Sequence, residues 1–166
     1  MLSMLLQVSV PTVLEPAFQT PTTPKKIGVL YHSQGESQVE LPRVTGKKRT
    51  ARLITARSPI RMEFQGNTSA IKIEGSNPTF VILFPSGDIT KLSLYPLNVN
   101  KNSREAVVGT GGSIHGESLA GAQTLPIDIV KESADSYRIA SAAPLKAGEY
   151  AFAFAGSNEF FCFTAG

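Results

Sequence analysis

The fold class is decided by the end of the chain, which reads Glu149-Tyr-Ala-Phe-Ala-Phe154, then Gly156-Ser-Asn158, then Glu159-Phe-Phe-Cys-Phe-Thr164. Large aromatic residues alternate with alanine in the first run and dominate the second. Aromatic side chains of this kind favour extended strands, and a Gly-Ser-Asn segment favours a tight turn. The stretch therefore predicts an antiparallel β-hairpin.

Strand-like runs separated by turn residues also occur earlier in the chain. Residues 27–31 and 38–41 flank a Gly35-Glu36-Ser37 turn and predict another hairpin, and residues 60–64 place Ile60, Met62 and Phe64 on one face. No window shows apolar residues at helical spacing over three turns. About eight to ten strands with frequent turns predict an all-β, antiparallel β-sandwich. The remaining expected strands are residues 50–56, 70–74, 79–84, 89–95, 105–108, 125–130 and 136–140.

A short motif before the last hairpin adds a family resemblance. Leu145, Gly148 and Tyr150 stand at the entrance to an alternating strand, and this spacing resembles the tyrosine corner of immunoglobulin-like and fibronectin type III domains. The resemblance implies an immunoglobulin-like β-sandwich in which the Tyr150 hydroxyl bonds to the backbone upstream and Gly148 takes a positive φ. Ala147 departs from the pattern, since such corners often have proline there, and the paired cysteines and tryptophan of antibody domains are missing.

A wider resemblance covers about residues 25–166. The segments 27–31, Leu41-Pro42, 103–109 and 144–152 are similar to uncharacterised exported β-domains of environmental bacteria. This resemblance implies a fold and an exported origin, and it implies no activity.

The first 24 residues differ from the rest, because they hold no basic residue and four prolines. We interpret residues 1–24 as an extended Pro-rich arm and residues 25–166 as the β-sandwich domain. Leu6, Val8 and Val10 alternate with polar residues, so this arm is expected to add a strand to a sheet. Either the arm docks on its own domain, or it is lent to a neighbouring subunit and drives assembly.

Charge is concentrated in residues 25–61, where nine basic residues face two acids, although the whole chain carries only +3. A lobe of this kind is typical of a polyanion-binding surface, with Lys47, Lys48, Arg49 and Arg52 as its centre in an apparent exposed turn after Gly46. The alternative is an ordinary solvated hairpin. No aromatic residue lies between Tyr31 and Phe64, so single-stranded nucleic acid is not expected as a partner.

Three features of the sequence are candidates for reaction sites, and we interpret each of them as non-catalytic. The glycine-rich residues 109–121 lack the spacing of a phosphate-binding loop and predict a flexible connection. Ser113 and His115 could form a nucleophile and its base, but no third group to orient the histidine can be named. Cys162 lies among phenylalanines and is expected to be a buried thiol. We therefore expect no catalytic, cofactor or metal residues.

Together these observations predict a non-enzymatic structural or interaction module at a bacterial surface or in the periplasm. Its partner would be a protein or a second copy of the chain, and no stretch is long and apolar enough for a membrane span. An extracellular or periplasmic location is expected from the resemblance, although the chain shows no clear signal peptide. The alternative is an accessory domain that binds anionic glycans or other polyanions through residues 25–61.

Overall fold

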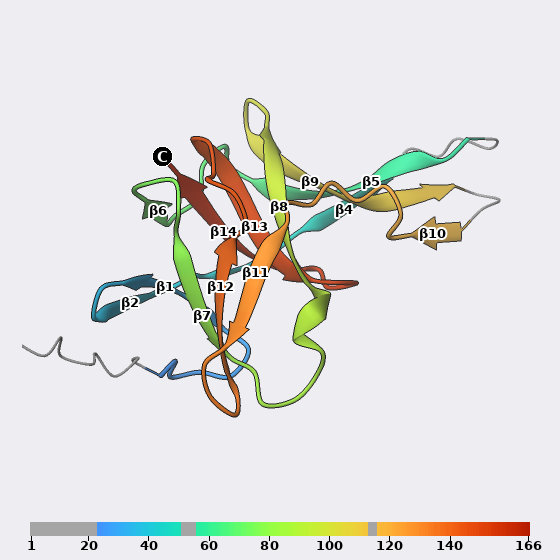
Figure 1. Cartoon of the computed structure of the whole chain (residues 1–166). Helices are drawn as coiled ribbons and strands as arrows, with labels where there is room; N and C mark the ends of the chain where they lie inside the picture. The colour runs from blue at the N-terminus through green and yellow to red at the C-terminus, as the bar shows by residue number, and fades with distance from the viewer. Residues whose placement is uncertain (1–22, 51–55, 113–115) are drawn as a thin grey trace, which may run out of the picture.

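The computed structural model describes residues 23–50, 56–112 and 116–166, and in this part of the chain it shows an all-β protein of mainly antiparallel sheets (Figure 1). A single-turn 3-10 helix, η1 (Ile89–Lys91), begins after Asp88. The strands are β1 (Leu30–Gln34), β2 (Ser37–Glu40), β3 (Arg43–Thr45), β4 (Lys47–Thr50), β5 (Ser58–Gln65), β6 (Lys72–Ile73), β7 (Thr79–Leu83), β8 (Leu92–Val99), β9 (Ser103–Gly112), β10 (Gly116–Ser118), β11 (Ile127–Lys131), β12 (Ser136–Ser141), β13 (Gly148–Phe154) and β14 (Glu159–Ala165).

The smaller sheet has five strands in the order β11-β12-β7-β1-β2. β1 and β2 pair as an antiparallel hairpin around Gly35, as the sequence predicted. β7 lies in the middle of the sheet, and Phe80, Val81 and Ile82 are all buried there, which explains its continuous apolar run.

The larger sheet follows the order β3-β14-β13-β8-β9-β5-β4, with β10 added to β9 and β6 added in parallel to β14. Its two end strands, β3 and β4, are consecutive in the chain and separated only by Gly46. One almost continuous strand therefore pairs with β14 at its start and with β5 at its end. This double pairing bends the sheet into a nearly closed barrel.

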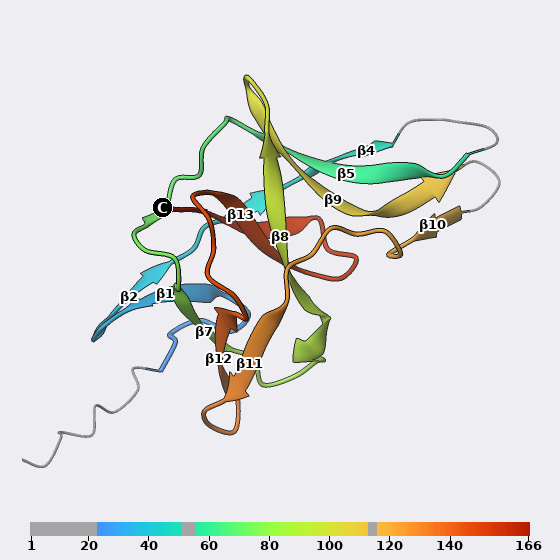
Figure 2. The ribbon, with the colours of Figure 1, turned by 45° about the horizontal axis from the view of Figure 1, so that its top comes forward.

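The barrel has a seam between β8 and β9. These strands share register only near Asn98 and Glu105, and they separate further along. The segment that follows β10 fills the gap, because Gln123 N donates to Val107 O and Leu125 N donates to Leu94 O. Beyond the seam, β4, β5, β9 and β10 project together to one side, as both views show (Figure 2).

Strands β13 and β14 have a hydrophobic core on each face. Phe152 and Phe163 pack with Phe80 and other side chains of the five-stranded sheet. Their sequence neighbours, including Ala151 and Cys162, face the barrel interior. Burial on both faces is the reason why this hairpin has almost no polar alternation.

The all-β, antiparallel prediction is confirmed, and so are both predicted hairpins and the buried face of Ile60, Met62 and Phe64. Two sheets do face each other, but the barrel was not anticipated. Two local expectations were wrong. Lys47–Thr50 is a strand and not a turn, and most of the glycine-rich residues belong to β9 and β10.

Candidate functional site

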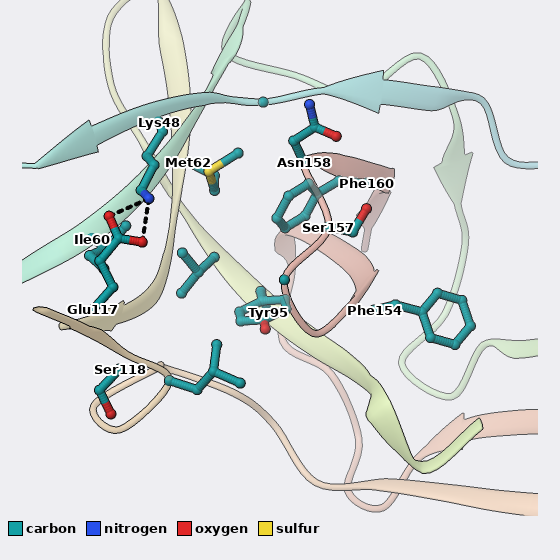
Figure 3. A pocket seen from close by; sticks show the side chains of 14 residues that line it. Lys48, Ile60, Met62, Tyr95, Glu117, Ser118, Phe154, Ser157, Asn158 and Phe160 are labelled. Atoms are coloured by element: carbon teal, nitrogen blue, oxygen red, sulfur yellow. Dashed lines mark hydrogen bonds and ion pairs between the residues drawn. The ribbon is translucent and has the colours of Figure 1, made fainter. Parts of the chain in front are cut away.

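The barrel has a cavity of about 450 Å³ at the end where the 156–158 turn lies, which we call the mouth (Figure 3). Its wall is mainly apolar and comes from strands β4, β5, β8, β9, β10, β13 and β14 and from the segments next to them. The large apolar lining residues are Ile60, Met62, Tyr95, Val108, Leu119, Phe154 and Phe160.

Strand alternation directs these side chains inward. Ile60 and Met62 lie on the buried face of β5, and Phe160 lies on the barrel face of β14. Tyr95 on β8 packs against the Phe160 ring at a centroid distance of 5.9 Å. Burial raises the pKa of the Tyr95 hydroxyl, so this group stays protonated at neutral pH.

Gly46 allows β3 and β4 to cross close to the mouth. A Cβ at this position would lie only 2.9 Å from both Met62 Cε and Phe64 Cε1, which is too close for packed carbon atoms. The Gly46 amide donates to Asn158 O at 2.8 Å and so joins this crossing to the 156–158 turn. The glycine therefore shapes the rim of the cavity.

The glycines of β9 have a similar role on the other side. A Cβ at Gly109 would overlap the carbonyl oxygen of Ser118 and lie 3.3 Å from Leu119 Cα. β10 can lie against β9 only because this side chain is absent. The glycine-rich stretch, predicted from the sequence to be a flexible connection, is in its described part a closely packed strand pair.

One ion pair crosses the mouth. Lys48 on β4 contacts both carboxylate oxygens of Glu117 on β10, and Figure 3 shows the two side chains meeting at the rim of the cavity. The side chains are 48% and 58% exposed, respectively. Neither residue type nor spacing in the sequence signals this contact, because the two residues lie 69 positions apart.

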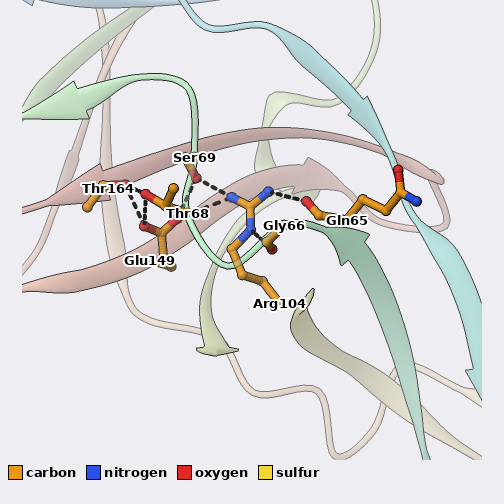
Figure 4. Close-up of polar contacts among 7 residues, drawn as sticks. All are labelled: Gln65, Gly66, Thr68, Ser69, Arg104, Glu149 and Thr164. Atoms are coloured by element: carbon orange, nitrogen blue, oxygen red, sulfur yellow. Dashed lines mark hydrogen bonds and ion pairs between the residues drawn. The ribbon is translucent and has the colours of Figure 1, made fainter. Parts of the chain in front are cut away.

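The opposite end of the barrel is sealed by a buried polar cluster (Figure 4). Arg104 Nη1 donates to Glu149 Oε2 at 3.1 Å and also to Ser69 Oγ, while Nε and Nη2 donate to the carbonyls of Gly66 and Gln65. The arginine thus ties the loop after β5 to β9 and β13. One polar residue in an otherwise apolar alternation, Arg104 before Ala106, was the available sequence signal.

Glu149 is fully integrated in this cluster. Its carboxylate also accepts hydrogen bonds from the hydroxyls of Ser69, Thr68 and Thr164. Burial alone would raise the pKa of Glu149, but the bonds from Ser69, Thr164 and Arg104 outweigh that effect and lower it. The carboxylate is therefore ionised and held in place, and we assign it a structural role.

Cys162 lies inside the barrel and is 2% exposed, which confirms the expected buried thiol. Burial raises its pKa to about 11. A thiol with such a pKa carries almost no thiolate at neutral pH, so Cys162 is inert packing rather than a nucleophile.

The basic residues of the predicted polyanion site are mostly engaged. Lys48 pairs with Glu117, Arg49 pairs with Glu63 at 2.5 Å, and neighbouring Arg61 faces Glu105 at 3.7 Å. Lys47 lies on β4 beside them and makes no ion pair with any described residue. Arg52, the fourth predicted residue, lies outside the described residues.

Of the predicted corner residues Leu145, Gly148 and Tyr150, the tyrosine makes the hydrogen bond that the resemblance implies. Tyr150 Oη donates to the carbonyl of Lys146 at 2.8 Å, and Leu145 is buried in the core between the sheets. The positive φ expected for Gly148 was wrong, since Gly148 is not among the glycines with that conformation. Its role is steric: the Tyr150 ring passes 3.7 Å from where a Cβ would lie.

The remaining predicted positions cannot be placed. Leu6, Val8 and Val10 of the arm, and the candidate pair Ser113 and His115, all lie outside the described residues. His32 is described: it is buried in the five-stranded sheet, where Nδ1 lies 3.1 Å from Thr79 O.

The described ranges lack two further structural features. Residues 23–50, 56–112 and 116–166 contain no group of three or more His, Cys, Asp or Glu placed to hold a metal ion. The same ranges contain no helix with the length and apolarity needed to cross a bilayer.

The comparisons with known proteins leave the family open. No family model, no curated protein and no solved structure matches this chain.

Proposed function

We propose that this chain is a non-enzymatic binding module that takes up a small, largely apolar molecule at the mouth of its barrel. The observation that supports this most directly is the cavity itself. Its volume of about 450 Å³ lies within the roughly 300–1,000 Å³ typical of small-molecule sites, and such sites combine an apolar wall with a few polar groups.

The asymmetry of the barrel also supports a binding role. The closed end is filled by the Arg104 and Glu149 cluster, and the middle of the barrel is filled by side chains that include Phe64 and Cys162. Among the described residues, the mouth is the end of the barrel where the cavity lies and where a ligand would enter. Apolar atoms of a ligand seated there leave water, which is the main source of affinity in such sites.

The hydroxyls at the rim favour binding over catalysis. Ser118 Oγ accepts a hydrogen bond from the amide of Ala120, and Ser157 Oγ accepts one from the amide of Glu159. Both hydroxyls serve their own turns. Among the described residues, neither is paired with a histidine that could act as its base.

Titration with the neutral fluorescent probe N-phenylnaphthylamine tests this function. Its emission should rise on binding to the native chain, and Val108→Phe should reduce the affinity by about tenfold or more because the larger ring occupies the cavity. Val130→Phe, at an exposed position of β11, is the matched control and should bind the probe normally.

Thermal unfolding of each variant checks that it is folded. If Val108→Phe does not fold, Leu119→Glu provides a second test, because Leu119 lines the cavity yet is 58% exposed. A native chain that leaves the probe emission unchanged, or a cavity variant that binds as well as the Val130 control, would overturn the proposal.

The other sequence expectations complement this function. Assembly through Leu6, Val8 and Val10 at a bacterial surface or in the periplasm stays a prediction, and native mass determination with and without residues 2–10 tests it. The relation of the facing sheets to immunoglobulin-like domains also stays a prediction. The Tyr150 hydrogen bond to Lys146 supports it.

A further inference from the structure

We propose that the ligand of the mouth is an apolar monocarboxylate, and that its carboxylate replaces Glu117 as the partner of Lys48. This inference rests on the proposed function and adds the chemical class of the ligand. It assigns Lys48 as the residue that recognises the anionic group.

The position of Lys48 on its strand is the first argument. Val44, Gly46 and Lys48 alternate toward the barrel, and Lys48 lies in register with Met62, whose side chain lines the cavity. Figure 3 shows the Lys48 side chain directed toward Glu117 beside Met62 and Ile60. A lysine is thus the cationic group placed directly above the apolar wall.

The second argument is that the ion pair between Lys48 and Glu117 spans four neighbouring strands. Lys48 and Glu117 belong to β4 and β10, and β5 and β9 lie between these two strands. The two side chains meet over Ile60 and Gly111, and the Glu117 Cγ lies 3.4 Å from where a Gly111 Cβ would be. The missing side chain at Gly111 leaves room for the pair to span the concave face, where the polar end of a ligand would lie.

The third argument is that the pair can be exchanged at little cost. Both side chains are about half exposed, and ion pairs in that setting contribute little to stability. A ligand carboxylate that brings its own apolar body into the cavity gains burial energy that the Glu117 side chain does not gain. It therefore competes for Lys48 with an advantage.

The fourth argument decides the sign of the ligand charge. On the projecting strands Glu63, Glu105 and Glu117 each form an ion pair with one basic side chain. Lys47 has no ion-pair partner among the described residues. The described residues of these strands therefore carry a surplus of positive charge. This favours an anion at Lys48 over an amine at Glu117.

Three probes that share a ten-carbon chain and differ in their polar group test the inference. They are decanoate, decanol and decylamine, and each is used to displace N-phenylnaphthylamine from the protein. Decanoate should bind about five- to tenfold more tightly than decanol, and decylamine should bind most weakly. The advantage of decanoate over decanol should shrink as salt is added, because salt screens an exposed ion pair.

Two variants assign the effect to the pair. Lys48→Met should remove the preference for decanoate over decanol and leave decanol binding intact. Glu117→Gln should tighten decanoate binding, because the competing carboxylate is gone, and a general loss of structure cannot produce that gain. Lys131→Met, on β11 of the five-stranded sheet, is the matched control and should behave like the native chain.

The outcomes separate this inference from the proposed function. If no probe displaces the dye and the dye itself does not bind, the proposed function fails. If all three probes bind equally, if decylamine binds most tightly, or if Glu117→Gln weakens decanoate binding, the mouth is a binding site but the monocarboxylate assignment is wrong.

Discussion

Arg104 and Glu149 face each other across the closed end of the barrel, with Nη1 and Oε2 separated by 3.1 Å and both side chains at most 6% exposed. Arg104 belongs to β9 and Glu149 to β13, and β8 lies between these strands in the sheet. The pair therefore spans the barrel interior rather than one strand ladder. Arg104 also donates hydrogen bonds to the loop after β5 and so holds this loop in place. The cavity lies at the other end of the barrel, at the mouth.

Loss of one member of this pair should be costly. Arg104→Met leaves the Glu149 carboxylate buried without its cation, and we expect the free energy of unfolding to fall by about 3–5 kcal/mol. Replacing both residues, as Arg104→Met with Glu149→Leu, should recover only part of the loss, because no buried charge remains but the carbonyls of Gly66 and Gln65 lose their donor. Urea unfolding of the native chain and the variants measures both values.

The matched control is the exposed pair of Arg138 and Glu132, whose nitrogen and oxygen atoms lie 3.0 Å apart. Arg138→Met should cost less than about 1 kcal/mol. Similar losses at positions 104 and 138 would show that the barrel end does not depend on the buried pair.

The strands with a buried face were predictable from the sequence, because apolar residues recur at every second position along them. Ile60, Met62 and Phe64 alternate with polar neighbours and are buried, and Phe80 to Ile82 form a continuous apolar run inside a sheet. The strands missed by the sequence analysis carry no such pattern. All four residues of β4 are exposed, so its pairing with β5 depends on backbone hydrogen bonds and charge, which give no hydrophobic signal.

The site could not be predicted for a related reason. The cavity wall combines residues of seven strands, β4, β5, β8, β9, β10, β13 and β14, with the 156–158 turn and the segment after β10. This combination depends on Gly46, which joins the strand paired with β14 to the strand paired with β5. Lys48 was predicted from its basic neighbours as part of a polyanion surface, which stays a prediction, but its place at the mouth and its pairing with Glu117 could not be predicted. The roles of Leu145 and Tyr150 were predictable, because the corner bond from Tyr150 to Lys146 is local in sequence.

The Tyr150 corner should contribute to stability through its hydroxyl. Tyr150→Phe removes the donor to Lys146 O and leaves the ring in the core, so we expect a loss of about 1 kcal/mol or more. Tyr137→Phe is the control, since its hydroxyl makes no hydrogen bond to the described residues and its removal should change stability by a few tenths of a kcal/mol. Equal melting temperatures for the native chain and Tyr150→Phe would remove the corner assignment.

His32 should make the stability depend on pH. Burial lowers its pKa below the ordinary 6.5, although the contact with Thr79 O acts in the opposite direction. The unfolded chain then binds a proton at a higher pH than the folded chain, so the free energy of unfolding should fall as the pH drops below about 6.5 and until the folded pKa is passed.

Urea unfolding at about pH 7.5 and about pH 5.5, on either side of the histidine's ordinary pKa, measures this dependence. The free energy of unfolding of the His32→Gln variant should decrease less between these pH values than that of the native chain, because the variant lacks the titrating imidazole. Any decrease that remains comes from titrating groups that both proteins share. A decrease of the same size in the variant would assign the pH effect to other residues.

Gly109 should be the glycine on which the mouth depends most. An alanine there would overlap Ser118 O, which belongs to the backbone of β10 and cannot rotate away as a side chain can. Gly109→Ala should therefore push β10 off β9, reduce stability by roughly 1–3 kcal/mol and move Glu117 away from Lys48. Gly111→Ala on the same strand is the comparison variant, because its new Cβ crowds side chains of the mouth rather than the backbone of β10. Its new Cβ would meet Ile60 Cδ1 at 3.2 Å and Glu117 Cγ at 3.4 Å, and both atoms belong to side chains that can shift.

The two glycine variants also connect the fold to the site. Displacement of β10 removes Ser118 and Leu119 from the cavity wall, so Gly109→Ala should bind N-phenylnaphthylamine more weakly than Gly111→Ala when both are folded. Thermal unfolding and probe titration of the same preparations give both quantities. If the two variants lose stability and affinity equally, the close approach at Gly109 does not control the mouth.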